Sequence, residues 1–229
     1  MTGLLASHPA SADYRQFPGA ETNDRTLKVQ ERVEEIYTSG DYARALLIYQ
    51  RELAPIGDKY AQYMVGFMHL SGEGVQENPV EALAWYSLAA ERGEEPLVEA
   101  RDELAEALTP EQRGAAYERF AQLWAHYGDG KLLLKLVRED LEQLNRQNYG
   151  RNGIDDPQTR VTFAARYSES ELADPRYRRF RERALERLAY IETHASAEQA
   201  GIKGNDPRAR ELEEEMEQLR RELSVPRRR

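Results

Sequence analysis

Apolar residues recur every three or four positions between residues 59 and 93, and this spacing predicts two amphipathic helices. The inward stripes contain Ala61, Met64, Val65, Met68 and His69 in the first helix and Ala82, Trp85, Tyr86, Ala89 and Ala90 in the second. Many of these side chains are small, so the two helices can approach closely where they face each other. The pattern therefore predicts a tightly packed helical hairpin.

The segment between these two helices has residues that are typical of a turn. Gly72-Glu73-Gly74-Val75 offers two residues that tolerate a positive φ. Asn78 is placed to cap the second helix, and Pro79 suits its first turn. Gly93 follows the last periodic position, where glycine commonly ends a helix. Residues 59–93 thus read as one helix–turn–helix unit.

This unit resembles the Sel1-like repeat, a relative of the tetratricopeptide repeat. The positions that carry the resemblance are Ala61, Gly66, Gly72, Gly74, Ala82, Trp85, Ala89, Ala90 and Gly93. The resemblance implies a bacterial protein built as an α/α solenoid. It also implies that the chain acts as a scaffold that binds another protein and performs no chemistry.

Two flanking segments predict weaker copies of the hairpin. Upstream, residues 29–39 and 42–54 form two helices around Gly40-Asp41, and Gly57 stands at the closing position. Downstream, residues 95–108 pair with residues 109–126, whose start combines Thr109 with Gln112 as a capping box. A single repeat cannot bury its own apolar face, so three stacked hairpins are expected to form a solenoid over residues 26–127.

The remaining residues predict a helical extension. Residues 128–147 read as a capping helix, amphipathic from Asp129 to Leu144, and residues 148–175 read as a loop that is either flexible or docked on the solenoid. Residues 176–225 predict two charged helices, which suit an intramolecular hairpin, a homodimerisation arm or packing on the body. Residues 1–25 predict a flexible leader. Arg160–Phe163 is the one short strand candidate, so the class is all-α.

Charge is divided unevenly along the 229 residues. Residues 1–175 carry 30 acidic and 18 basic side chains, whereas residues 176–229 carry 11 acidic and 14 basic ones. An acidic body argues against nucleic acid, whose phosphates it repels. The basic cluster of the tail consists of Arg176, Arg178, Arg179, Arg181 and Arg183. This basic cluster could bind RNA or an acidic lipid surface. The favoured interpretation is that the arginines lie on a solvated helix face and pair with Glu182 and Glu186.

The sequence contains few candidate catalytic or metal-binding motifs. The four histidines have no metal-binding spacing, the chain has no cysteine, and no Gly-x-Ser-x-Gly elbow occurs. Gly128-Asp129-Gly130-Lys131 shares letters with a phosphate-binding loop but lacks the rest of that motif. We therefore expect no enzyme activity, no metal and no cofactor. The alternative is an envelope-associated hydrolase of cell-wall or glycan material that uses Glu73 and Glu77.

The favoured function is a non-catalytic protein-interaction module or adaptor. Aromatic and arginine side chains dominate protein interfaces, and the expected contact residues are Tyr60, Tyr63, Phe67, Tyr86 and Arg92. Solenoid packing is the competing interpretation of each. No apolar run is long enough to cross a membrane. Ala10-Ser11-Ala12 matches a signal-peptidase pattern, which favours the periplasm, with the cytoplasm as the alternative.

Overall fold

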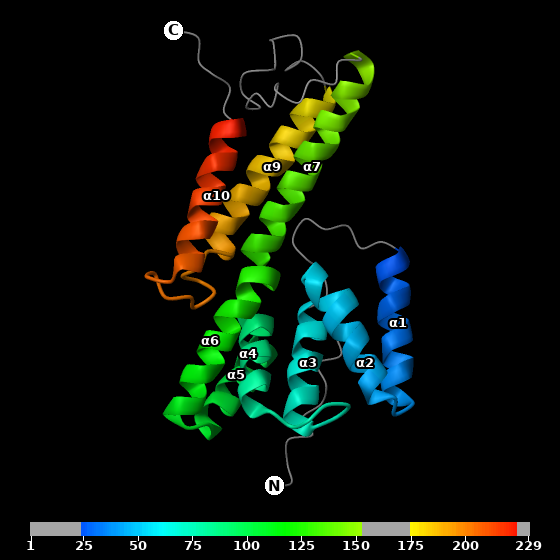
Figure 1. The fold of residues 1–229 in the computed structure, drawn as a ribbon, viewed down its shortest axis with the longest axis vertical. Coiled ribbons are helices and arrows are strands. Elements are labelled where there is room, and N and C mark those ends of the chain that lie inside the picture. Colours follow the sequence, from blue (N-terminus) through cyan, green and yellow to red (C-terminus); the bar gives the residue numbers. More distant parts are fainter. Residues whose placement is uncertain (1–23, 153–174, 224–229) are drawn as a thin grey trace. The chain divides into compact units, whose positions relative to one another are not determined.

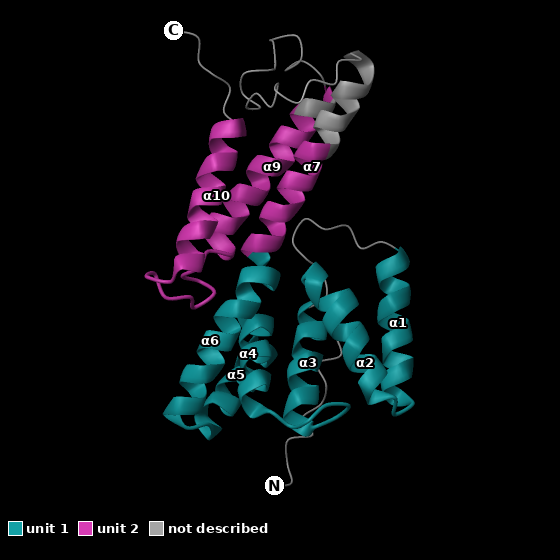
Figure 2. Cartoon of the chain, in the orientation of Figure 1, with its two compact units in different colours: residues 1–129 teal, residues 130–229 magenta. Residues whose placement is uncertain are grey.

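The computed structural model describes residues 24–152 and 175–223. Within those ranges every regular element is a helix, so the predicted all-α class is confirmed (Figure 1). The helices form two compact units, Met1–Asp129 (unit 1) and Gly130–Arg229 (unit 2), shown in Figure 2. The strand candidate at residues 160–163 lies outside the described residues.

Unit 1 is a short solenoid of helical hairpins, as predicted. Its helices are α1 (Asp24–Thr38), α2 (Tyr42–Ile48), α3 (Lys59–Ser71), α4 (Pro79–Ala89), α5 (Glu95–Ala107) and α6 (Pro110–Tyr127). Helix α2 continues as a π-turn, η2 (Tyr49–Leu53), and a 3-10 turn, η3 (Ala54–Ile56), and α4 ends in the 3-10 turn η4 (Ala90–Arg92). Helix α4 lies at the centre, because it contacts α3, α5 and α6.

The predicted start signals operate as helix caps. The side chain of Asn78 accepts from the backbone N–H of Glu81 at 3.1 Å. Thr109 and Gln112 form a reciprocal capping box, with distances of 3.3 and 3.0 Å. Asp58 caps α3 by accepting from the N–H of Ala61 at 2.9 Å. These local bonds fix where the hairpin helices begin.

Two predicted boundaries in the first hairpin were wrong. Helix α1 begins at Asp24, five residues before the predicted Val29, and an aspartate in the first turn suits the positive end of the helix dipole. The predicted helix 42–54 changes its hydrogen-bond pattern at Tyr49, where the N–H of Ala54 reaches back to the carbonyl of Tyr49. Pro55 has no N–H to continue the α-helical pattern, so the last turns take another form.

Unit 2 contains α7 (Asp129–Asn152) from its second residue onward, α9 (Pro175–His194) and α10 (Pro207–Leu223). The predicted capping helix, residues 128–147, continues five residues further, to Asn152. This corrects the predicted loop start at residue 148, and residues 153–174 of that loop lie outside the described residues. The solenoid-capping role of α7 stays a prediction.

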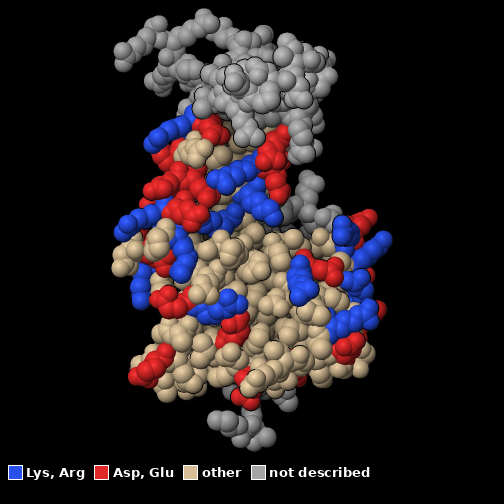
Figure 3. Space-filling model, in the orientation of Figure 1, with Lys and Arg blue, Asp and Glu red and all other residues tan. Residues whose placement is uncertain are grey.

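Helices α9 and α10 form the predicted hairpin within the chain. Their apolar stripes are buried, namely Phe180, Ala184, Leu188 and Ile191 on α9 and Ala209, Leu212, Met216, Leu219 and Leu223 on α10. Ion pairs join both helices to α7, with Arg187 donating to Asp140 at 2.8 Å and Lys131 lying 3.7 Å from Glu215. In the view of Figure 3, charged side chains crowd the described part of unit 2. Uncharged side chains cover much of the surface that this view shows of unit 1.

The arginine cluster of the tail is part of this surface. Arg183 and Arg187 pair with Asp140 of α7 at 3.0 and 2.8 Å, instead of with the expected Glu182 and Glu186. The guanidinium of Arg181 donates to the backbone carbonyl of Leu223 at 3.0 Å. These contacts stabilise the helical packing of unit 2, so for Arg181 and Arg183 the interpretation as a solvated helix face paired with Glu182 and Glu186 is corrected.

Candidate protein-interaction site

Two of the five predicted contact residues lie in the core. Tyr60 is 6% exposed and Tyr86 is 3% exposed, so neither has surface to offer a partner. The ring of Tyr60 meets that of Tyr49 edge to face, with centroids 6.4 Å apart. Tyr86 packs against Gly66, where an added Cβ would lie 2.5 Å from its Cδ1 atom. The structure therefore corrects both predictions, and solenoid packing explains both residues.

Arg92 is held by bonds inside unit 1. Its Nε and Nη2 atoms donate to the carboxylate of Asp129 at 2.6 and 3.0 Å, and Nη2 also donates to the carbonyl of Gly57 at 2.8 Å. Only 9% of its side chain is exposed. Arg92 is thus a structural ion-pair partner, which corrects its prediction as a contact residue.

Tyr63 and Phe67 remain as candidate contact residues. They lie four positions apart on α3, hence on one face of that helix, and each is partly exposed. The ring of Tyr63 stacks on that of Tyr86, with centroids 5.0 Å apart and an angle of 8° between planes. Its inner edge packs on Ala89, Ala90 and Leu97, and burial raises the pKa of its hydroxyl. Tyr63 is therefore packed against Tyr86 and the neighbouring core while part of the residue stays exposed.

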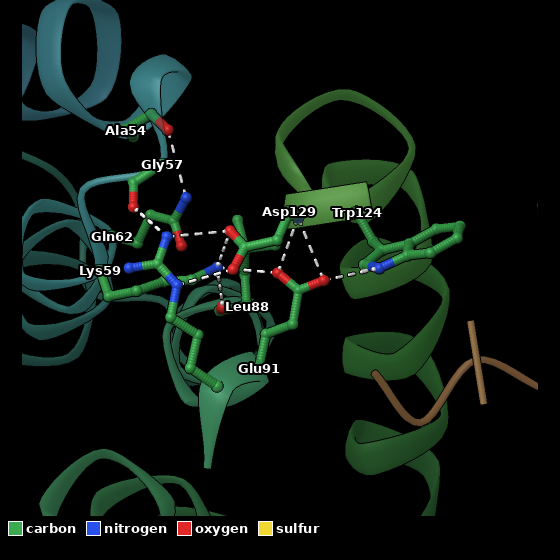
Figure 4. Close-up of polar contacts among 9 residues, drawn as sticks. Ala54, Gly57, Lys59, Gln62, Leu88, Glu91, Trp124 and Asp129 are labelled. Carbon is green, nitrogen blue, oxygen red and sulfur yellow. Dashed lines mark hydrogen bonds and ion pairs between the residues drawn. The ribbon is translucent and has the colours of Figure 1, made fainter. Parts of the chain in front are cut away.

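A buried ionic cluster lies where three segments of unit 1 converge (Figure 4). Lys59 of α3 donates to Glu91 of η4 at 2.7 Å and to the carbonyl of Leu88 at 3.1 Å, and lies 3.1 Å from Asp129. The side chains of Lys59, Glu91 and Asp129 are 0%, 1% and 2% exposed. Together with Arg92 they place two cations and two anions in the interior, so the cluster is balanced in charge.

Glu91 also holds the start of α7. Both of its carboxylate oxygens accept from the backbone N–H of Asp129, at 3.2 and 3.0 Å, and one accepts from the indole N–H of Trp124 at 3.0 Å. The first N–H groups of a helix have no partner within the helix, and a carboxylate there also meets the positive end of its dipole. Glu91 thus caps α7 from a distant part of the sequence.

The pKa values of the two acids move in opposite directions. Burial raises the pKa of Glu91, and the nearby charge of Lys59 offsets only part of that effect. Burial alone would also raise the pKa of Asp129, but Lys59 and Arg92 outweigh it and hold that pKa below its ordinary value. Asp129 is therefore the firmly ionised member of the cluster, because two cations face it and one faces Glu91 directly.

The carboxylates of the hydrolase hypothesis do not form an acid–base pair in the described bonds. Glu73 accepts from the hydroxyl of Tyr37 at 2.7 Å, which links the repeat turn to α1. Burial and this bond raise the pKa of Tyr37, so the hydroxyl stays protonated and donates. Glu77 is exposed in the turn before Asn78. Both features fit a structural turn.

His69 lies near a second polar cluster of unit 1, which consists of Glu81, Trp85 and Arg119. Arg119 of α6 donates to both oxygens of Glu81 on α4, at 2.8 and 3.0 Å, and the indole N–H of Trp85 reaches Glu81 at 3.0 Å. The Nδ1 atom of His69 is buried with no hydrogen-bond partner. Burial lowers the pKa of His69, the charge of Glu81 opposes this, and that of Arg119 adds to it. The imidazole is accordingly neutral in the folded chain.

The neutral His69 gives an expected pH dependence. Its folded pKa lies below the ordinary value of about 6.5, so the unfolded chain binds a proton first as the pH falls through that value. Unfolding free energy should therefore decrease between pH 7.5 and 5.5, and H69Q should show a smaller decrease. Urea midpoints at both pH values measure this. An equal pH dependence in H69Q would show that other groups cause the loss.

In the described parts of the chain, no helix is long and apolar enough to cross a membrane, and no group of three or more His, Asp or Glu residues could hold a metal ion. Residues 59–94 match the family model of the Sel1 repeat. The chain thus contains one segment that matches the Sel1 repeat, and this segment covers α3, α4, η4 and the first residue after Gly93. No curated protein and no solved structure gives a significant match. Sel1 repeats are generally protein-interaction modules and are typically non-catalytic.

Proposed function

We propose that this chain is a non-catalytic adaptor that binds another protein through the surface of its helical repeats, with Tyr63 and Phe67 of α3 at the contact. The observation that carries the proposal is the Sel1 repeat at residues 59–94, set within a stacked helical solenoid. Tyr63 is partly exposed and stacks on the buried Tyr86, which suits a residue that anchors an interface. Because its side chain is already held in place, little conformational entropy is lost on binding.

The charge of unit 1 favours a basic partner. Residues 24–129 carry 20 acidic and 10 basic side chains, and the two buried cations of the ionic cluster are already matched by two buried anions. Apart from the buried Asp58, the remaining acidic side chains of this range are at least partly exposed. Complementary potential speeds association and suppresses wrong partners, so a Lys- or Arg-rich protein surface fits better than a nucleic acid.

Affinity capture from the native organism, with mass spectrometry, would supply candidate partners, and the purified pair would then be titrated. The double variant Y63A/F67A should bind the partner at least about 30-fold more weakly, the scale of an interface hot spot of about 2 kcal/mol. L47A is the matched control, since Leu47 is a 47% exposed side chain on α2. Retained helicity must accompany the loss. Unchanged affinity in Y63A/F67A would refute this contact surface.

The hydrolase alternative gains no support from the bonds of Glu73 and Glu77. Turnover of muropeptides and glycans by the purified chain would revive it, provided that E73Q abolished the activity. A periplasmic location stays a proposal of ours, and detection of a mature N-terminus at Asp13 would support it. A homodimer through residues 176–225 likewise stays a prediction, for which light scattering of the full chain is the measurement.

A further inference from the structure

The outer face of helix α5 in unit 1 carries mostly negative charge. Of its 13 residues only Leu97 is buried, because α5 packs on α4 and η4 along one side. Five exposed carboxylates lie on the opposite side, within roughly 100° of arc at 3.6 residues per turn. These five, the α5 acidic stripe, are Glu95, Glu99, Asp102, Glu103 and Glu106. The one cation of α5, Arg101, donates to Asp102 at 2.7 Å. Among the described residues, the other four carboxylates have no hydrogen-bond or ion-pair partner.

The α5 acidic stripe does not stabilise its own helix. Like charges four positions apart on a helix repel each other, and the stripe contains three such pairs, Glu95–Glu99, Glu99–Glu103 and Asp102–Glu106. Glu95 in the first turn meets the positive end of the helix dipole, but Glu106 in the last turn meets the negative end. Helix stability therefore does not explain the stripe, whereas a cationic ligand would relieve the repulsion.

The stripe borders the surface proposed for the partner. Tyr63 of α3 and Val98 of α5 pack on the same buried cluster around Leu97, and both residues are partly exposed. Val98 lies three positions after Glu95 and four before Asp102, which places these two carboxylates beside it on the surface of α5. A ligand in contact with Tyr63 and Val98 therefore meets the stripe directly.

We propose that the partner bound at Tyr63 presents a Lys- or Arg-rich segment, which lies along the α5 acidic stripe. This inference rests on the proposed function and adds the chemistry of the ligand and a second helix that binds it. From Glu95 to Glu106 the helix rises about 17 Å, so a segment of about three helical turns covers the stripe. Complementary charge favours this occupant over an acidic peptide or a nucleic acid, both of which the stripe repels.

A labelled peptide tests the stripe in the full chain. The probe is a synthetic amphipathic peptide of Lys and Leu, about 12 residues long to match three helical turns, and fluorescence anisotropy measures its Kd. We expect E99Q/E103Q to weaken binding about tenfold, because two exposed charge pairs are lost. Glutamine favours helix as well as glutamate does, so the variant should keep its helicity. Added salt should weaken the binding of the unmodified chain.

E31Q/E35Q is the matched control. Glu31 and Glu35 are exposed and lie four positions apart on α1, so this variant changes the net charge by the same amount. It should change the affinity by less than about twofold, because these side chains lie outside the proposed surface. Equal losses in the two variants would overturn the proposal, since overall charge alone would then attract the probe. Absence of probe binding by the unmodified chain would overturn it as well.

The variant Y63A/F67A separates this inference from the proposed function. Weaker probe binding in both Y63A/F67A and E99Q/E103Q supports both. A loss in Y63A/F67A with unchanged binding in E99Q/E103Q would keep the contact at Tyr63 and overturn the role of the α5 acidic stripe. The opposite result, a loss in E99Q/E103Q alone, would support the stripe and refute the contact at Tyr63.

Discussion

Replacement of Lys59 by methionine is expected to lower the free energy of unfolding by about 3–5 kcal/mol, the usual cost of removing one partner from a buried ion pair. The ammonium group contacts Glu91, Asp129 and the carbonyl of Leu88, and its side chain is fully buried. Without it, Arg92 alone faces two buried carboxylates. Methionine fills a similar volume, so the loss reports charge and hydrogen bonding. Urea unfolding followed by tryptophan fluorescence measures it.

R32M is the matched control for K59M. Arg32 pairs with Glu52 at 3.1 Å, but the two side chains are 50% and 42% exposed, so the expected change is within about 0.5 kcal/mol. The double variant K59M/E91Q should recover part of the loss, since it removes one of the uncompensated charges. A K59M effect as small as that of R32M would mean that water reaches the cluster in solution.

Replacement of Gly74 by alanine should produce the second large effect. Gly74 has a φ of 73°, and an added Cβ would stand 2.5 Å from the backbone nitrogen of Ala43 at the start of α2. The left-handed conformation costs alanine about 1–2 kcal/mol. Forced separation of the turn from α2 adds about 1–3 kcal/mol, as overpacking does in cores. The melting temperature and the urea midpoint should both fall.

G93A separates these two contributions. Gly93 has a similar φ of 77°, but nothing lies within 4 Å of its Cβ position, so only the backbone strain of about 1–2 kcal/mol should appear. The difference between G74A and G93A then measures the contact between the repeat turn and the preceding hairpin. Equal losses in the two variants would show that the turn does not press on α2.

Local signals in the sequence were sufficient for the hairpins of unit 1. Asn78, Thr109 and Gln112 act within four residues of their own positions, so their roles follow from spacing alone. The same holds for Gly57 and Gly93, whose positive φ values end a helical turn. Capping and turn chemistry are local, which is why these elements could be predicted without knowledge of the packing.

The surface of α3 could not be predicted in this way. Periodicity marked one inward face, but α3 packs against η2, η3 and α4, and its first four residues, Lys59–Gln62, are all buried. A helix surrounded in this manner has little solvent-facing surface, so Tyr60 became a core residue. The ionic cluster had no local signal either, because Lys59 and Asp129 are 70 positions apart in the sequence. Asp129 was marked beforehand as the start of a helix and Arg92 as a contact residue, but neither was marked as part of a buried ion pair.

The balance of charge inside the cluster has a consequence for salt. Two buried cations and two buried anions cancel, and apart from Asp58 the other acidic side chains of residues 24–129 are at least partly exposed to water and ions. Mobile ions screen exposed charges over about 8 Å at physiological ionic strength, whereas buried pairs are screened much less. Added salt should therefore weaken the attraction of a basic partner while leaving the thermal stability of the solenoid nearly unchanged.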